Sequence, residues 1–452
     1  MRDLFFVFYL VGLLALGFRR PFLFVLAYAY VDIVSPQQLS YFLLNRIPLS
    51  LIIAGLAVAG WLISDDKKGL KVAPRQVLML ALLAYAAVTT LHADFPMEAA
   101  AKWSWVWKAM IWAIFLPLAL RTRLRVESYL LFMTLSAAAI VIVGGIKTIV
   151  SGGGYGELNL MVDSNSGLYE GSTISTIAIA IIPIILWLAR HGTIFPRDWR
   201  VRVFAGGLIF ACLLIPVGTE ARTGLICIAV VAFLLLRDMK RRFLYAPLIA
   251  VAGLCAVPFL PHSFSSRMET IGGYQADSSA ASRLAVWAWT WDYAQHHPMG
   301  GGFDAFRGNR LQVTITSDMG VGDAQDTSQQ VMIDEGRAYH SSYFEMLGEQ
   351  GFPGLFMFLI LHLTGLVRME VIRRRYRRTE DAQEKWIAPL ATALQSAQIV
   401  YLVGSFFVGI AFQPFVLGLV GVQIGFDTLV GRGSREESRK GWRRPPVPQA
   451  AG

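Results

Sequence analysis

Residues 338–359 read AYHSSYFEMLGEQGFPGLFMFL, and they join the longest polar segment of the chain to an apolar run. The pattern predicts a short polar-to-amphipathic helix over HSSYFEMLGEQ, a break at residues 351–354 and then a purely apolar helix. One histidine, His340, is predicted to lie on the short helix, where polar and apolar sequence meet. The fold class depends on whether this apolar run crosses a membrane or packs in a soluble core.

The composition indicates a membrane protein. Hydrophobic residues make up 55% of the 452, and charged residues only 16%, compared with about 25% in soluble domains. Apolar runs recur with the length of about 17–23 residues that crosses a bilayer as a helix, and they are too long and continuous for barrel strands. We expect an all-α polytopic protein with about 12–14 transmembrane helices. The candidate spans are 4–18, 21–35, 48–64, 75–91, 103–120, 127–150, 171–189, 201–218, 222–236, 243–260, 353–369, 387–409 and 413–430.

The net charge of +10 is distributed as a membrane topology signal and does not predict nucleic-acid binding. When the spans alternate sides, most of the 41 lysines and arginines fall on one side, which the positive-inside rule assigns to the cytoplasm. The predicted parts are an N-terminal bundle of about ten spans (1–260), an extracytoplasmic loop (261–350), C-terminal transmembrane helices (351–431) and a basic disordered tail that contacts anionic lipid (432–452).

The long extracytoplasmic loop has structure of its own. Residues 282–297 (SRLAVWAWTWDYAQHH) predict a helix with one apolar face made by Leu284, Trp287, Ala288 and Trp291. Its tryptophans favour a position at the membrane interface. Pro298 and the three following glycines at 300–302 end the helix, and the polar run 316–335 is predicted to be flexible.

Three extracytoplasmic side chains are candidates for chemistry. Two guanidiniums, Arg222 and Arg283, have the planar fork that suits a diphosphate, and His340 can take a proton from a hydroxyl. Each also has a structural interpretation, because Arg222 can pair with Glu220 or with headgroup phosphates and Arg283 can be a helix-end charge. Together they suit glycosyl transfer from a lipid diphosphate without a metal.

Other motifs are absent from the sequence. There is no Gly-x-x-x-x-Gly-Lys-Ser/Thr phosphate loop, which argues against an ATP-driven pump. There is no His-Glu-x-x-His or paired-cysteine pattern, and Cys212, Cys227 and Cys255 lie within apolar runs, where they are predicted to pack as small hydrophobes. We therefore expect no metal and no cofactor.

Three motifs resemble those of the O-antigen ligase and polymerase superfamily. They are Arg-Thr-Gly at 222–224, the Ser-Arg and tryptophan helix ending in His-Pro-x-Gly-Gly-Gly-Phe at 282–303, and His-x-x-Tyr-Phe-x-x-Leu-x-Glu-x-Gly-x-x-Gly-Leu at 340–355. The N-terminus MRDLFFVFYLVGLLALGFRRPF and the segment GSFFVGIAFQPF are most like the O-glycosylation ligases associated with the exosortase A system. This chain departs from the family pattern with Ala221 in place of the frequent serine and Ser341 in place of the usual asparagine.

The resemblance implies a multi-spanning, GT-C-like glycosyltransferase of the bacterial inner membrane. It would take a glycan from undecaprenyl diphosphate on the periplasmic face and join it to a glycan, lipid or protein acceptor, without a metal. His340 would be the base, and Arg222 and Arg283 would bind the diphosphate. Additional candidate site residues are Arg337, Tyr343 and Glu349.

Two alternatives stay open at this stage. A polysaccharide polymerase would use the same lipid-linked donor and differ only in its acceptor. A non-catalytic transporter or flippase of lipid-linked glycans belongs to another class, but such proteins often contain inverted repeats and charges near the membrane midplane. The sequence shows no internal repeat, and its polar residues concentrate outside the spans.

Overall fold

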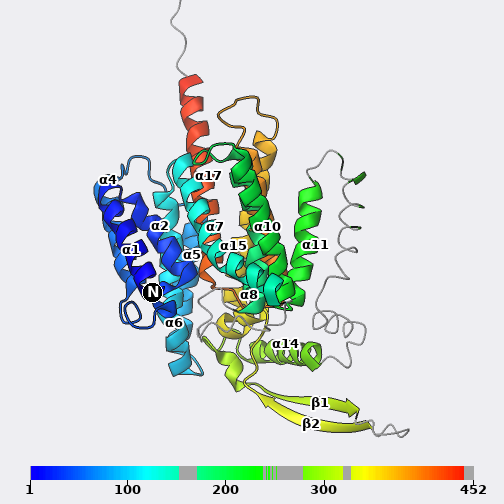
Figure 1. Cartoon of the computed structure of the whole chain (residues 1–452). Helices are drawn as coiled ribbons and strands as arrows, with labels where there is room; N and C mark the ends of the chain where they lie inside the picture. Colours follow the sequence, from blue (N-terminus) through cyan, green and yellow to red (C-terminus); the bar gives the residue numbers. More distant parts are fainter. Residues whose placement is uncertain are drawn as a thin grey trace, which may run out of the picture.

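The computed structural model describes residues 2–151, 170–237, 278–318 and 327–441, together with isolated positions between 241 and 251. Helices predominate in this part of the chain and form the bundle in Figure 1. The predictions for Cys255, for residues 152–169, for most of the span 243–260, for 261–277 and for 442–452 concern residues outside this description.

The described elements follow one another along the chain in this order. They are α1 (Arg2–Arg19), α2 (Phe22–Val34), α3 (Pro36–Leu39), α4 (Leu49–Ser64), α5 (Pro74–Leu91), α6 (Pro96–Ala119), α7 (Arg123–Ser151), α8 (Gly171–Ala180), α9 (Ile182–His191), α10 (Trp199–Gly218), α11 (Arg222–Arg237), α14 (Ser278–His296), the 3-10 turn η3 (Ala305–Gly308), β1 (Arg310–Asp318), β2 (Thr327–Glu335), α15 (Ser342–Tyr376), α16 (Ile387–Gly404) and α17 (Pro414–Gly441).

Seven helical segments of the described residues are long and apolar enough to cross a membrane: α5, α7, α8 with α9, α10, α15, α16 and α17. Two shorter apolar helices, α2 and α4, accompany them. The predicted all-α polytopic membrane protein is therefore confirmed. The total of 12–14 transmembrane helices remains a prediction.

The core of the bundle is built from helices that are distant in the sequence. α17 packs along α6, α2 packs along α7, and α15 lies between α5 and α16. Tyr28 of α2 stacks on Trp112 of α6 with ring centres 3.7 Å apart. Gly421 lets α17 approach α6 closely, because a Cβ there would lie 3.0 Å from the carbonyl oxygen of Ala113. In a membrane the hydrophobic effect does not drive helices together, so small residues that permit close van der Waals packing stabilise their contacts.

A small layer made of α14 and the two strands covers one end of the bundle. We call this the His340 end, and it is the end at which α8, α11 and α15 begin. Figure 1 shows α14 lying across it, with the hairpin of β1 and β2 projecting beyond.

The hairpin corrects the prediction of flexibility for residues 316–318 and 327–335, whereas residues 319–326 lie outside the described part of the chain. β1 and β2 pair antiparallel from Arg310 opposite Glu335 to Asp318 opposite Thr327. The β-branched residues of VTIT at 313–316 favour such a strand, but the pairing depends on a partner more than ten residues away.

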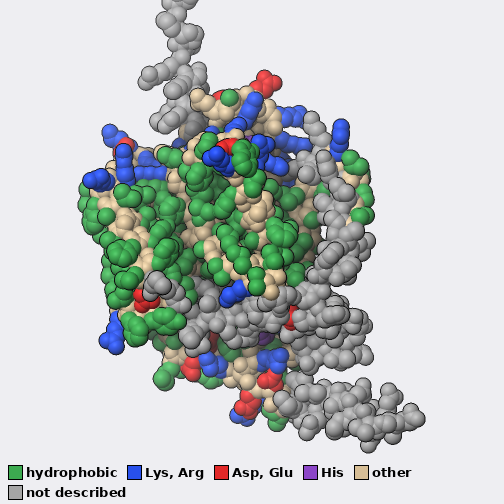
Figure 2. Space-filling model, viewed as in Figure 1, with side chains coloured by type: hydrophobic (Ala, Val, Ile, Leu, Met, Phe, Trp, Pro, Cys, Tyr) green, Lys and Arg blue, Asp and Glu red, His purple; other side chains and the backbone are tan. Residues whose placement is uncertain are grey.

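Basic residues gather at the end opposite His340. Figure 2 shows lysines and arginines there, separated from the His340 end by a broad hydrophobic band. Helices α1, α9, α11 and α15 all end on this side with basic residues in their last turn. The two ends are therefore distinguished by charge, as the sequence predicts. Which end faces the cytoplasm remains a prediction of the positive-inside rule.

Candidate functional site

His340 lies two residues before the helix and is not a part of it. α15 begins at Ser342 with Ser341 at its N-cap, so the prediction of a helix that includes His340 was wrong by two residues. The reason is local, because His340 has a φ of 47°, in the left-handed region that cannot start an α-helix. Such a backbone is uncommon for a residue with a side chain, and it persists where surrounding structure holds it.

The first turn of α15 is fastened to the segment that follows α16. The backbone N–H of Ser342 donates to the carbonyl of Ser405 at 2.8 Å. The Ser342 hydroxyl donates to the carbonyl of Val408 at 3.0 Å and accepts from the N–H of Ile410 at 2.8 Å. These bonds fix the residues directly after His340, so the turn that contains the histidine is anchored on its C-terminal side.

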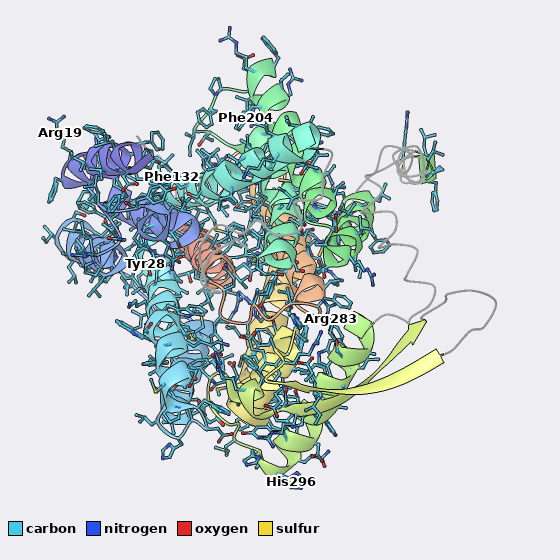
Figure 3. All side chains as sticks on the ribbon, turned by 60° about the horizontal axis from the view of Figure 1, so that its bottom comes forward. Arg19, Tyr28, Phe132, Phe204, Arg283 and His296 are labelled. Carbon is cyan, nitrogen blue, oxygen red and sulfur yellow. The ribbon has the colours of Figure 1, made fainter. Side chains whose placement is uncertain are left out.

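Trp287 of α14 anchors the turn on the other side. Its indole N–H donates to the carbonyl of Tyr339 at 2.9 Å, and its ring stacks on Phe344 with centres 4.9 Å apart. Arg283 lies one turn before Trp287 on the same face of α14. In Figure 3 Arg283 is at the end of α14 beside the bundle, whereas His296 is at the far end. Docking of the tryptophan thus brings Arg283 within electrostatic reach of His340.

Of the face of α14 predicted to be apolar, only Trp287 is partly buried against the rest of the protein. Leu284 and Trp291 are both more than half exposed, while Val286, Thr290 and Ala294 on another face are fully buried. An exposed apolar face suits a helix at a membrane surface. The interfacial position of α14 is not tested by these contacts and stays a prediction.

Arg222 lies at the same end of the bundle, where α11 begins beside α8. It is the first residue of α11 and follows Glu220, another residue with left-handed backbone at a φ of 52°. Thr219, just before this turn, hydrogen-bonds Ser175 of α8 at 2.8 Å. The N-cap of α8 is Glu170, whose charge acts on His340. The start of α11 therefore lies next to the helix whose capping carboxylate is within electrostatic reach of His340.

The surroundings of His340 favour the neutral imidazole. Burial by nearby protein lowers the pKa of His340, Arg283 and Arg337 lower it further, and Glu170 opposes them. The side chain nevertheless remains accessible to solvent. A neutral, accessible histidine can accept a proton from a hydroxyl at pH 7.

A buried ionic cluster lies behind this turn, and the sequence did not predict it. Lys102 of α6 contacts Glu345 at 2.7 Å and Glu349 at 2.8 Å, both on the first half of α15. The side chains of Glu349 and Glu345 are 0% and 8% exposed. Phe303 covers the ammonium, with its ring centre 5.4 Å away. The available signal was a lysine at the start of a predicted span, on the extracytoplasmic side.

The triple-glycine loop closes over the break in α15. The break is at Gly351, with φ 62° and ψ −166°, as the Gly-Phe-Pro-Gly pattern predicted. It leaves carbonyls of the first half of α15 without helical partners. Gly301 donates to the carbonyl of Gly348 at 3.0 Å and Gly302 donates to that of Glu349 at 2.9 Å. The glycine loop after α14 thus binds the segment just before the break in α15. We call this contact the joint between α14 and α15.

The three additional candidates differ in position. The Arg337 backbone is held at both its N–H and its carbonyl by Asn309, and its guanidinium pairs with Asp334. The Tyr343 hydroxyl donates to the carbonyl of Leu402 at 2.8 Å. Glu349 is buried and pairs with Lys102. Tyr343 and Glu349 therefore support the fold around His340, while Arg337 affects the histidine through its charge.

No group of three or more His, Cys, Asp or Glu side chains that could hold a metal ion occurs within the described residues. Cys212 and Cys227 are buried free thiols. His296 and His297, at the far end of α14, each contact a backbone carbonyl four residues earlier.

Comparison with protein families matches two parts of the chain. Residues 207–359 match the family described as O-antigen ligase, and this range contains Arg222, Arg283 and His340. Residues 1–193 match a family of unknown function (DUF5935), and this range contains Lys102 and Glu170. No curated protein matches the chain. Residues 207–359 of this multi-pass membrane protein are thus similar to the O-antigen ligase family.

Proposed function

We propose that this protein is a membrane glycosyltransferase that moves a glycan from undecaprenyl diphosphate to an acceptor hydroxyl. The main supporting observation is the pair of Arg283 and His340, because the docked helix α14 places the charge of Arg283 within electrostatic reach of an accessible histidine at one end of the bundle. The O-antigen ligase family match over the same residues supports a glycan ligase or polymerase type of activity.

In the proposed reaction His340 acts as the base. Its neutral imidazole takes the proton of the acceptor hydroxyl, and the acceptor oxygen attacks the anomeric carbon of the donor glycan. The bond from that carbon to the diphosphate oxygen breaks, and the lipid diphosphate leaves with its electron pair. Arg283 and Arg222 stabilise the charge that develops on the leaving group. The proton on His340 then passes to solvent.

The proposed location is the bacterial inner membrane with the His340 end in the periplasm. The basic helix ends on the opposite side support this orientation through the positive-inside rule. The periplasm offers no nucleotide sugars, so the donor glycan must already be bonded to its leaving group, the lipid diphosphate. The association with the exosortase A system rests only on the sequence resemblance.

The test is glycan transfer in membranes by His340→Ala and Arg283→Ala variants. We expect at least a hundredfold loss in the histidine variant, since a positioned base contributes about 10²–10⁴ in rate. His296→Ala is a matched control, because His296 is exposed at the far end of α14. Wild-type transfer by both site variants would end the proposal.

The acceptor distinguishes a ligase from a polymerase that uses the same donor. Deletion of a ligase should leave full-length lipid-linked glycan that is attached to nothing else. Deletion of a polymerase should instead leave single repeats on the lipid. We favour the ligase, and the glycan that accumulates in a deletion strain decides between the two.

A further inference from the structure

A cavity of about 470 Å³ opens at the end of the bundle opposite His340. It lies between the last turns of α9, α11 and α15 and the first turns of α16. The straight part of α15 from Phe352 to Tyr376 spans about 36 Å, so this cavity is far from the glycan-transfer site. Nothing in the proposed reaction uses it.

Basic side chains line the mouth of this cavity. Arg190, Arg377 and Lys385 are exposed at the rim, and His191 and Arg373 lie beside them. Arg373 pairs with Glu370 at 2.8 Å, whereas Arg190, Arg377 and Lys385 make no ion pair within the described chain. None of the described lining residues is acidic. The described lining of the cavity therefore carries basic and no acidic side chains at its rim.

The walls below the rim are apolar. Leu186 and Trp187 of α9, Leu234 and Leu235 of α11, and Ala393 of α16 line them. A small soluble anion would gain nothing from such walls, but the glycerol and first acyl carbons of a lipid would bury apolar surface there. A basic rim over an apolar interior matches an amphiphile with an anionic head.

We propose that this cavity binds an anionic phospholipid from the leaflet at that end of the bundle. The phosphate would pair with the guanidiniums of Arg190 and Arg377 and with the ammonium of Lys385. The proximal acyl carbons would lie against Trp187 and Leu234. The lipid would join α9 and α11 to α15 and α16, and so stabilise the folded bundle by binding it. This proposal does not depend on the glycan-transfer proposal.

The purified full-length protein in neutral detergent provides the test. Phosphatidylglycerol should raise the melting temperature and remain bound in native mass spectrometry, while phosphatidylcholine and inorganic phosphate should do neither. The double variant R190Q/R377Q should weaken phosphatidylglycerol binding at least about tenfold, since two basic contacts with the headgroup are lost.

A matched control separates the cavity from general surface charge. R200Q/R378Q also removes two arginines from the same end of the bundle, both exposed and neither lining the cavity, and it should keep wild-type binding. Equal loss in the two double variants overturns the proposal, as does stabilisation by inorganic phosphate that equals stabilisation by phosphatidylglycerol.

Filling the cavity tests the apolar part of the site without changing a charge. Thr392 lines the cavity and is partly exposed, so Thr392→Trp should occupy the space of the acyl carbons. We expect this variant to lose phosphatidylglycerol binding with the rim intact. Unchanged binding in the folded variant would show that the lipid does not enter the cavity. If the variant does not fold, the comparison of the two double variants still decides.

Discussion

The reactivity proposed for His340 depends on charges from three different elements. Burial lowers the pKa of His340, Arg283 and Arg337 lower it further, and Glu170 raises it. A base is active when neutral, so transfer should rise as pH increases through this pKa. Arg337→Gln removes a positive charge, raises the pKa of His340 and should move the acidic limb of the pH profile to higher pH. Glu170→Gln removes a negative charge and should move the limb to lower pH.

Arg310→Gln is the control for this pair of variants. Arg310 is exposed at the base of the hairpin and pairs with Glu335 at 3.2 Å, and its charge is not among those that shift the pKa of His340. Its pH profile should match that of the wild type. If both Arg337→Gln and Glu170→Gln leave the limb in place, a group other than His340 titrates in the reaction.

Lys102 is predicted to be essential to the stability of the site, although it is far from His340 in the sequence. Lys102→Met leaves Glu345 and Glu349 buried without their cation. Removal of one member of a buried ion pair costs about 3–5 kcal/mol, so thermal unfolding in detergent should begin at a markedly lower temperature. Replacing both glutamates by glutamine in the same protein should recover part of the loss.

Lys108→Met gives the comparison on the same helix. The ammonium of Lys108 lies 5.8 Å from the ring centre of Trp107 and makes no ion pair within the described chain. Its replacement should change the unfolding temperature little. Equal stability of the Lys102→Met protein and the wild type would contradict the role assigned to the cluster.

At the scale of elements, the joint between α14 and α15 depends on glycine. Gly300 has a φ of 84°, and a Cβ there would lie 2.5 Å from the carbonyl oxygen of Glu349. The left-handed backbone alone costs an alanine about 1–2 kcal/mol, and the clash adds to it. Gly300→Ala should therefore lower the unfolding temperature and reduce transfer, because the joint also positions the turn of His340.

Gly308→Ala is the matched substitution in the same segment. A Cβ at Gly308 would meet nothing closer than 3.6 Å, in Phe95, and its backbone is not left-handed. We expect wild-type stability and transfer from this variant. Similar losses from Gly300→Ala and Gly308→Ala would mean that the close approach at Gly300 does not matter.

Local signals explain which elements the sequence could predict. The helix expected at 282–297 is found as α14 (Ser278–His296), and the break expected at 351–354 is found at Gly351. Both follow from periodicity and from glycine and proline. The hairpin and the partners of Lys102 depend on pairing between distant segments, so no local pattern revealed them. The same limit applies to the site, because the sequence placed Arg283 and His340 on one side of the membrane but did not predict the tryptophan that joins them.

At the scale of the whole molecule, the family matches do not mark separate folding units. α5 and α6 lie within residues 1–193, yet they pack on α15 and α17. α16 and α17 follow the end of the O-antigen ligase match at residue 359 and still form much of the core. The two matched ranges and the helices after residue 359 therefore belong to one bundle.

A chain of buried polar groups ties four helices of this bundle together. Arg75 of α5 donates to Gln423 of α17 at 3.1 Å, and Gln423 donates to Gln398 of α16 at 2.9 Å. Gln398 in turn contacts the ring of His362 on α15 at 3.0 Å. Inside a membrane such groups have no water to replace a lost partner.

Gln423→Leu should therefore destabilise the whole bundle while leaving the glycan-transfer site intact. Arg75 is only 7% exposed, and its guanidinium would lose its acceptor, at a cost of about 1–3 kcal/mol. Thermal unfolding should show this loss, and protein that remains folded should transfer glycan at the wild-type rate, because Arg75 lies in the first turn of α5, at the end opposite His340. Gln383→Leu, on the exposed connection before α16, should change neither quantity. Lost transfer with wild-type stability would instead place Gln423 in the reaction and contradict a purely structural role.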